Sequence, residues 1–135
     1  VYFNTEYKIS KHLKWNGGIS YHRGIDSDSR NLPFISPVAY GGALNYHKGT
    51  FTAGIDMQGA TKQVNFNPIF GENQTDAYTA FGLSIGKTFH ISKNTFYVKV
   101  GVQNIFDRFY STYSDWNNIP RIGRNFHFTL SYKIG

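Results

Sequence analysis

The sequence predicts an all-β chain that folds as an antiparallel meander of about seven strands. Three observations lead to this fold class. Apolar and polar residues alternate with a period of two along most of the chain, no segment carries the apolar stripe of an amphipathic helix, and the connections between the alternating segments are short and long in turn. A period of two is typical of a strand whose two faces meet different surroundings.

The composition restricts the class of protein. The chain has 135 residues with 14 Lys+Arg and 8 Asp+Glu, which gives a net charge of +6, and 40% of the residues are hydrophobic. This apolar content argues against a disordered chain, and the length corresponds to one domain or to one piece of a larger domain. The positive residues are dispersed, so no nucleic acid is expected as a partner. The sequence contains no Cys, which excludes a disulfide scaffold and a thiolate metal site.

Each strand is justified by an apolar row that alternates with polar residues or Gly. In chain order the rows are Phe3, Tyr7 and Ile9, then Trp15, Ile19 and Tyr21, then Val38, Tyr40, Leu44 and Tyr46, then Phe51, Ala53, Ile55 and Met57, then Phe81, Leu83 and Ile85, then Phe96, Val98, Val100 and Val102, and finally Phe126, Phe128, Leu130, Tyr132 and Ile134. The last row is the clearest, because every residue between its members is polar. We therefore expect a sheet with one apolar and one polar face.

The connections predict where such a sheet resides. Residues 10–14, 47–50 and 92–95 are tight turns, whereas residues 24–36, 60–76 and 105–124 are long loops. Alternation of short turns and long loops is typical of an outer-membrane β-barrel. The aromatic residues of the apolar rows fall near the two ends of the strands, with small aliphatic residues between them, which is the order that a bilayer favours. Lys87 falls on the apolar face near a short turn, where its stem reaches the interface.

The strand count predicts that this sheet belongs to something larger. Six reversals separate the first strand from the seventh, so the two run in the same direction and cannot close an antiparallel barrel. Open sheet edges in lipid leave backbone groups unpaired at a cost of several kcal/mol each. We therefore expect the chain to be part of a bigger barrel, or to lack an eighth strand.

Two motifs in about the last sixty residues carry a family resemblance. The first is Asn104-Ile105-Phe106-Asp107-Arg108-Phe109-Tyr110, and the second is Ile119-Pro120-Arg121-Ile122-Gly123-Arg124-Asn125-Phe126 before the final strand. Together they resemble the C-terminal end of TonB-dependent outer-membrane receptors. The positions that match the family pattern are Asn104, Phe106, Asp107, Tyr110, Pro120, Gly123, Arg124 and Asn125. Ile122 replaces a usual Pro, and Ile134 stands where a closing Phe is expected.

The resemblance implies a fold, a location and an activity. It implies a transmembrane barrel of about 22 strands with a plugged lumen, of which residues 1–135 form the C-terminal portion, the plug domain being absent from this chain. It implies the outer membrane of a Gram-negative bacterium and energy-coupled uptake of a scarce nutrient, most readily an iron–siderophore or similar metal complex. The implied partners are the rest of the barrel and the plug, the TonB complex through that plug, the barrel-assembly machinery, and outer-membrane lipid with lipopolysaccharide. No enzyme activity and no cofactor are expected.

The candidate functional residues lie in the last long loop and on the apolar face. Aromatic rings and Arg planes suit anionic, ring-bearing ligands, which makes the candidate ligand-binding residues Tyr110, Tyr113, Trp116 and Arg121. The alternative is that this loop packs on itself, with Asn104 and Asp107 capping its entry. The residues expected to face lipid are Phe126, Phe128, Leu130, Tyr132, Phe96, Val98 and Val100.

No catalytic or metal site is expected from the sequence. His22, His47 and His127 fall on the polar face at different heights, so we do not expect them to converge. Asp26 and Asp28 lack the Gly and the distant Glu of a calcium loop, and we expect them in a solvated loop. Two other readings of the whole chain stay open, namely a small eight-stranded outer-membrane barrel with a structural or adhesive role, and a soluble ligand-binding β domain.

Overall fold

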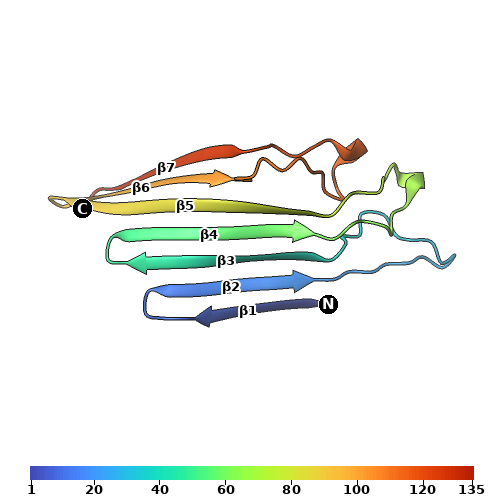
Figure 1. Ribbon diagram of the computed structural model, residues 1–135, viewed down its shortest axis with the longest axis horizontal. Helices are drawn as coiled ribbons and strands as arrows, with labels where there is room; N and C mark the ends of the chain where they lie inside the picture. Colours follow the sequence, from blue (N-terminus) through green and yellow to red (C-terminus); the bar gives the residue numbers. More distant parts are fainter.

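The computed structural model describes residues 1–135, and it is one sheet of seven strands. The strands are β1 (Tyr2–Lys8), β2 (Leu13–Ser20), β3 (Ala39–Lys48), β4 (Phe51–Ala60), β5 (Tyr78–Ile91), β6 (Asn94–Gln103) and β7 (Asn125–Lys133), with two short 3₁₀ helices, η1 (Pro68–Phe70) and η2 (Trp116–Asn118). Every strand pairs antiparallel with its neighbour in the sequence, so the order in the sheet is the order in the chain (Figure 1). The predicted antiparallel meander is confirmed.

The strand bounds differ from the sequence prediction where pairing extends or ends a strand. β5 is the longest, because Tyr78 pairs with Ala60 at one end and Ile91 pairs with Asn94 at the other. The predicted apolar row of this strand covered only its middle. Conversely, β2 ends at Ser20, so Tyr21 lies just beyond the strand, although its backbone still bonds Val1. Ile9, Val38 and Ile134, also predicted on strands, lie just outside them.

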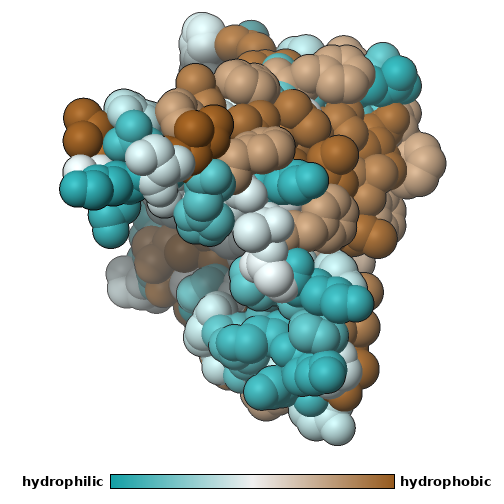
Figure 2. Space-filling view, turned by 90° about the vertical axis from the view of Figure 1, so that its left-hand side faces the viewer, coloured by the Kyte–Doolittle hydropathy of each residue, from teal (hydrophilic) through white to brown (hydrophobic).

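The register brings the apolar rows together on one face. Moving across the sheet, Leu44 pairs with Ile55, Ile55 pairs with Leu83, and Val98 pairs with Leu130. In a view from the short-turn end, the hydrophobic side chains gather along one side of the sheet and the hydrophilic ones lie on the other parts of the surface (Figure 2). The prediction of one apolar and one polar face is confirmed.

This apolar face has nothing packed over it in the chain. Phe128 is 65% exposed, Leu130 is 59% exposed and Ile55 is 51% exposed. The only buried hydrophobic residues are Ala60 and Ala80, so no hydrophobic core exists between two layers. Because a sheet with an apolar face must bury that face against another element or in lipid, the covering material has to come from outside these residues.

Each face of the sheet has a position where a glycine makes room for a ring. The ring of Tyr40 lies over Gly59, where an added Cβ would come within 2.6 Å of the ring. The ring of His127 lies over Gly101 on the polar face in the same way. In both pairs a bulky ring fills the space that its glycine partner leaves open.

The ends of the sheet differ. The short turns lie at one end, where Gly49 (φ 58°) and Ser92 (φ 55°) adopt the left-handed conformation that tight hairpins require. The long loops lie at the other end, as Figure 1 shows.

Lys87 lies on the apolar face with its ammonium 5.4 Å from the centre of the Phe89 ring. β1 and β7 form the two edges of the sheet and do not contact each other. No helix of the chain is long and apolar enough to cross a membrane.

Candidate functional site

Three long loops gather at one end of the sheet, and we name them by order. The first long loop comprises residues 21–38, the second residues 61–77, and the third residues 104–124. Together they contain the 3₁₀ helices and all five buried polar side chains, namely Gln63, Asn67, Glu72, Thr75 and Asn104. Since the buried polar side chains are confined to the loops, hydrogen bonds rather than an apolar core order those loops.

Glu72 joins the first two long loops. It is 7% exposed, and its two carboxylate oxygens accept hydrogen bonds from the backbone N–H groups of Phe34 (2.6 Å) and Asn67 (2.7 Å). Phe34 has a φ of 58°, an unusual value for a bulky residue. The short, charge-assisted bond to its N–H helps to hold the first long loop in that conformation.

Two amide side chains strengthen the same junction. Gln63 donates from Nε2 to the carbonyl of Ile35 (2.6 Å), and Asn67 donates from Nδ2 to the carbonyl of Asn31 (2.8 Å). Asn67 also caps η1, accepting from the N–H of Ile69 through Oδ1 (3.2 Å). In each of these bonds the partner of the side-chain amide is a backbone group, and two of the bonds reach the first long loop, so the first and second long loops form one connected unit.

The third long loop is braced by an ion pair. The guanidinium of Arg121 contacts both carboxylate oxygens of Asp115, with Nε–Oδ2 at 2.8 Å and Nη2–Oδ1 at 2.7 Å. Thr112 donates to the same carboxylate from its N–H (2.7 Å) and its hydroxyl (2.9 Å). Partial burial raises the pKa of Asp115, but the hydrogen bonds from Thr112 and Arg121 outweigh it and hold that pKa below its usual value.

Aromatic stacking fixes the third loop to the sheet. The rings of Tyr110 and Tyr78, at the start of β5, stack with their centroids 4.1 Å apart. The N–H of Arg121 bonds the carbonyl of Tyr110 (2.8 Å), and Asn118 donates to the carbonyl of Gln74 in the second long loop (2.9 Å). The third loop is therefore bonded both to β5 and to the second loop.

The family-like motif residues form the entry and exit of the third loop. The Asn104 side chain accepts from the N–H of Arg108 and donates to its carbonyl, both at 2.8 Å. Asp107 accepts from the N–H of Arg124 (2.6 Å). An added Cβ at Gly123 would lie 2.5 Å from that Asp107 carboxylate, so a side chain there would displace the carboxylate from its bond to Arg124. The predicted capping by Asn104 and Asp107 is confirmed.

The remaining motif residues support the same turn. Asn104 (φ 50°) and Asp107 (φ 53°) both take left-handed backbone angles, which Asn and Asp tolerate better than most residues. The Phe106 ring packs edge-on against Phe81 of β5 at 5.7 Å, and Arg124 donates from Nε to the carbonyl of Ile105 (3.0 Å). Pro120 and Asn125 flank the return of the loop into β7.

The four predicted ligand-binding residues all lie in the third long loop, but their side chains have different surroundings. Tyr110 is half-buried against Tyr78, and Arg121 is paired with Asp115, so both groups already have partners within the chain. Trp116 is exposed at the start of η2. Tyr113, earlier in the same loop, is half-buried. Ligand binding by these four residues stays a prediction, and the structure shows that the loop also packs on itself.

The aspartates of the first long loop are used by a neighbouring arginine. Asp26 accepts from the N–H of Arg30 (2.8 Å) and from its Nε (2.9 Å), while Asp28 pairs with Nη2 of Arg30 at 2.7 Å. The hydrogen bond from the Arg30 backbone is the main reason why the pKa of Asp26 lies below its usual value. Asp26 therefore closes a turn of the loop.

The structure contains no cluster of three or more His, Cys, Asp or Glu side chains that could hold a metal ion, and His22, His47 and His127 do not come together.

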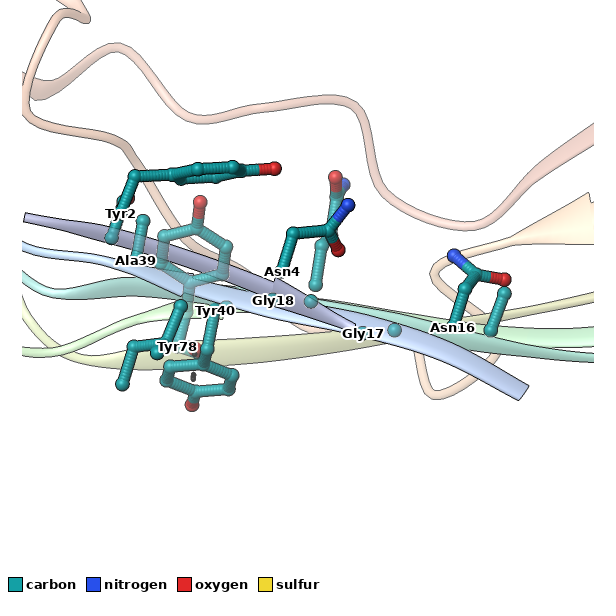
Figure 3. A pocket seen from close by; sticks show the side chains of 15 residues that line it. Tyr2, Asn4, Asn16, Gly17, Gly18, Ala39, Tyr40 and Tyr78 are labelled. Carbon is teal, nitrogen blue, oxygen red and sulfur yellow. Dashed lines mark hydrogen bonds between the residues drawn. The ribbon is translucent and has the colours of Figure 1, made fainter. Parts of the chain in front are cut away.

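A hollow of about 580 Å³ on the sheet was not found by sequence reasoning. It lies over β1 to β4, where the small residues Gly18, Ala39 and Gly41 leave space between larger polar side chains. Figure 3 shows Tyr2, Asn4 and Asn16 projecting from one side of the sheet, while Tyr40 projects from the other. The signal in the sequence was the group of Ala and Gly residues at positions 39 and 41–43, a pattern that an interrupted strand also shows.

The comparisons with known proteins address the fold. No protein-family model matches the chain, and no curated protein matches its sequence significantly. Among solved structures the chain is similar to the copper transporter OprC, with a TM-score of 0.82 and 22% sequence identity over 97% of this chain. The chain spans 22% of the length of that protein, and at this identity the likeness shows the fold alone. That protein is an outer-membrane barrel, so the predicted fold class, a meander that is part of a large transmembrane β-barrel, is confirmed.

Proposed function

We propose that this chain forms part of the wall and three of the long loops of a TonB-dependent outer-membrane transporter. The observation that carries the proposal is the exposed apolar face, which crosses all seven strands and is backed by a polar face. The motif residues from Asn104 to Asn125 support the family, and the likeness to a transporter of the same fold supports the activity. In this proposal the apolar face touches outer-membrane lipid, and the polar face borders the lumen.

The whole protein then works without covalent chemistry. Residues 1–135 supply the C-terminal portion of the barrel, the rest of the barrel closes the β1 and β7 edges, and a plug couples the transporter to TonB. The cell outer membrane of a Gram-negative bacterium is the proposed location. The proposed cargo is a scarce nutrient bound as a metal complex, such as an iron–siderophore. Copper is the second candidate, because the protein of similar fold is a copper transporter.

The lipid-facing assignment is tested by charge placed on each face of β4. Ile55 is in the middle of the apolar row, and Asp56 is its neighbour on the polar face. An arginine on the lipid face near the bilayer midplane costs about 2–4 kcal/mol of folding free energy, while a lumen position costs far less. Ile55→Arg is expected to show this loss and Asp56→Arg is not, as measured by denaturant unfolding of the whole protein in phospholipid bilayers.

Equal costs at the two positions would contradict the membrane assignment, as would a protein that stays soluble and monomeric without detergent. The transport assignment has its own test in cells. Cells that produce the protein are given an iron–siderophore or a copper salt, and metal content is compared with and without functional TonB. Accumulation that depends on both the protein and TonB is expected for one of the two cargoes, and TonB-independent accumulation would contradict the proposal.

A further inference from the structure

A shallow groove lies at the long-loop end of the apolar face. It has a volume of about 380 Å³ and is lined by six residues, Tyr40, Ala77, Tyr78, Thr79, Phe106 and Arg108. The register places Tyr40 and Thr79 in the same row as Gly59, between the apolar rows and the loops. The groove therefore lies where the apolar face meets the polar loops, which in the proposed orientation is the level of lipid headgroups.

The floor of the groove is amphipathic. The Tyr40 ring crosses over Gly59, and its hydroxyl lies 2.6 Å from Oγ1 of Thr79. On the other side Phe106 is 72% exposed and packs edge-on against Phe81. Hydroxyl groups thus line the part of the groove nearest the middle of the sheet, while an aromatic pair offers an apolar surface beside them.

Arg108 supplies an unpaired charge to this groove. Its backbone is held by the side chain of Asn104 through two hydrogen bonds of 2.8 Å. Its guanidinium makes no hydrogen bond and no ion pair within the chain, unlike those of Arg30 and Arg121. The adjacent carboxylate of Asp107 accepts from the backbone of Arg124. The result is an exposed cation on a fixed backbone, beside an apolar surface and two hydroxyl groups.

This combination matches one class of ligand. A guanidinium binds phosphate oxygens through two parallel N–H donors, one proton of the bonded Tyr40–Thr79 hydroxyl pair is left to donate to a further phosphate oxygen, and the aromatic pair favours hydrocarbon. We infer that the groove binds the phosphate-bearing headgroup of a lipid in the leaflet on the long-loop side. This inference rests on the membrane orientation given under the proposed function. Arg108 contacts the phosphate, and an acyl chain lies along Phe106 and Phe81. The net charge of +6 favours the same anionic lipid.

The test measures lipid binding to the purified whole protein in maltoside micelles by native mass spectrometry. The probes are lipid A, the same lipid without its phosphates, and inorganic phosphate. Lipid A is expected to bind, and the dephosphorylated lipid is expected to bind at least tenfold more weakly. Arg108→Ala is expected to weaken lipid A binding about tenfold, or about 1.4 kcal/mol, and Arg108→Lys is expected to restore part of that loss.

Lys87→Ala is the matched control, because Lys87 is a cation on the same face near the short-turn end. It is expected to leave lipid A binding unchanged. Equal effects of Arg108→Ala and Lys87→Ala would overturn the inference, since they indicate general attraction to positive charge. Inorganic phosphate that competes with lipid A at equal concentration would also overturn it, because the site would then be one for a free anion. Neither result would contradict the barrel assignment. That assignment is contradicted only if the protein is soluble without detergent, or if Ile55→Arg and Asp56→Arg cost the same folding free energy.

Discussion

Replacing Glu72 with Ala is expected to separate the first long loop from the second without unfolding the sheet. The carboxylate is the only group that bonds both the Phe34 and the Asn67 N–H, and it does so from a position that is 7% exposed. None of the strand pairs involves Glu72. The perturbation therefore acts on the loop junction alone.

The size of the effect follows from the two bonds. A buried donor that loses its partner costs about 1–3 kcal/mol, and bonds to charged groups lie toward the upper part of the range. Two donors at a junction near the surface, where water can partly replace the carboxylate, give about 2–4 kcal/mol. Glu72→Gln keeps one carbonyl oxygen as an acceptor, so about half of this loss is expected.

The assay is amide hydrogen exchange of the whole protein in detergent. Since a tenfold change corresponds to about 1.4 kcal/mol, Glu72→Ala is expected to lower the protection of the Phe34 and Asn67 amides about 30-fold to several hundred-fold. Amides in the middle of β4 and β5 are expected to keep their protection. Glu6→Gln is the control, because Glu6 is an exposed carboxylate that pairs only with Lys14 on the sheet, and it is expected to change neither loop.

Unchanged protection of Phe34 and Asn67 in Glu72→Ala would refute the reasoning, because the loops would then be held by something other than this carboxylate. A parallel loss in β4 and β5 would also refute it, since the junction would then be part of the sheet's own stability. The intermediate behaviour of Glu72→Gln separates hydrogen bonding from the mere removal of side-chain volume.

Two further predictions concern the third long loop and the sheet. Because the folded pKa of Asp115 lies below its usual value, its contribution to stability is full above the unfolded value of about 3.9 and is lost as pH falls through the folded value. The protection of the Thr112 amide, that is, its exchange rate relative to the intrinsic rate at each pH, should therefore fall below about pH 4, and Asp115→Asn should remove that acid-induced loss. In β4, Gly59→Ala should destabilise the sheet by about 1–3 kcal/mol, because its Cβ would meet the Tyr78 carbonyl oxygen at 2.5 Å and the Tyr40 ring at 2.6 Å. Gly54→Ala should cost less, because the atoms nearest to its Cβ would be Oγ of Ser84 at 3.3 Å and Oδ1 of Asn45 at 3.4 Å. Equal costs in a denaturant series would contradict the packing argument.

Much of the fold was predictable because it is encoded locally. The alternation of apolar and polar residues from Asn125 to Lys133 defines two faces whatever the strand pairs with. The same holds for the six earlier strands and for the order of short and long connections. The turn chemistry of Asn104 and Asp107 is local as well, since it depends on side chains that bond backbone groups within a few residues or set the backbone angle.

The sequence by itself determined the strands, their two faces and the ends at which the loops lie, because a period of two needs only near neighbours to be read. The tertiary structure alone decided which loop groups meet. Glu72 reaches a residue 38 positions away, and Arg121 is paired while Arg108 is free, although each is an ordinary polar residue in a loop. The burial and pairing of such residues depend on contacts between segments that are distant in the sequence, and no local pattern contains these contacts. The apolar rows, by contrast, predict an apolar face in any strand register that aligns them.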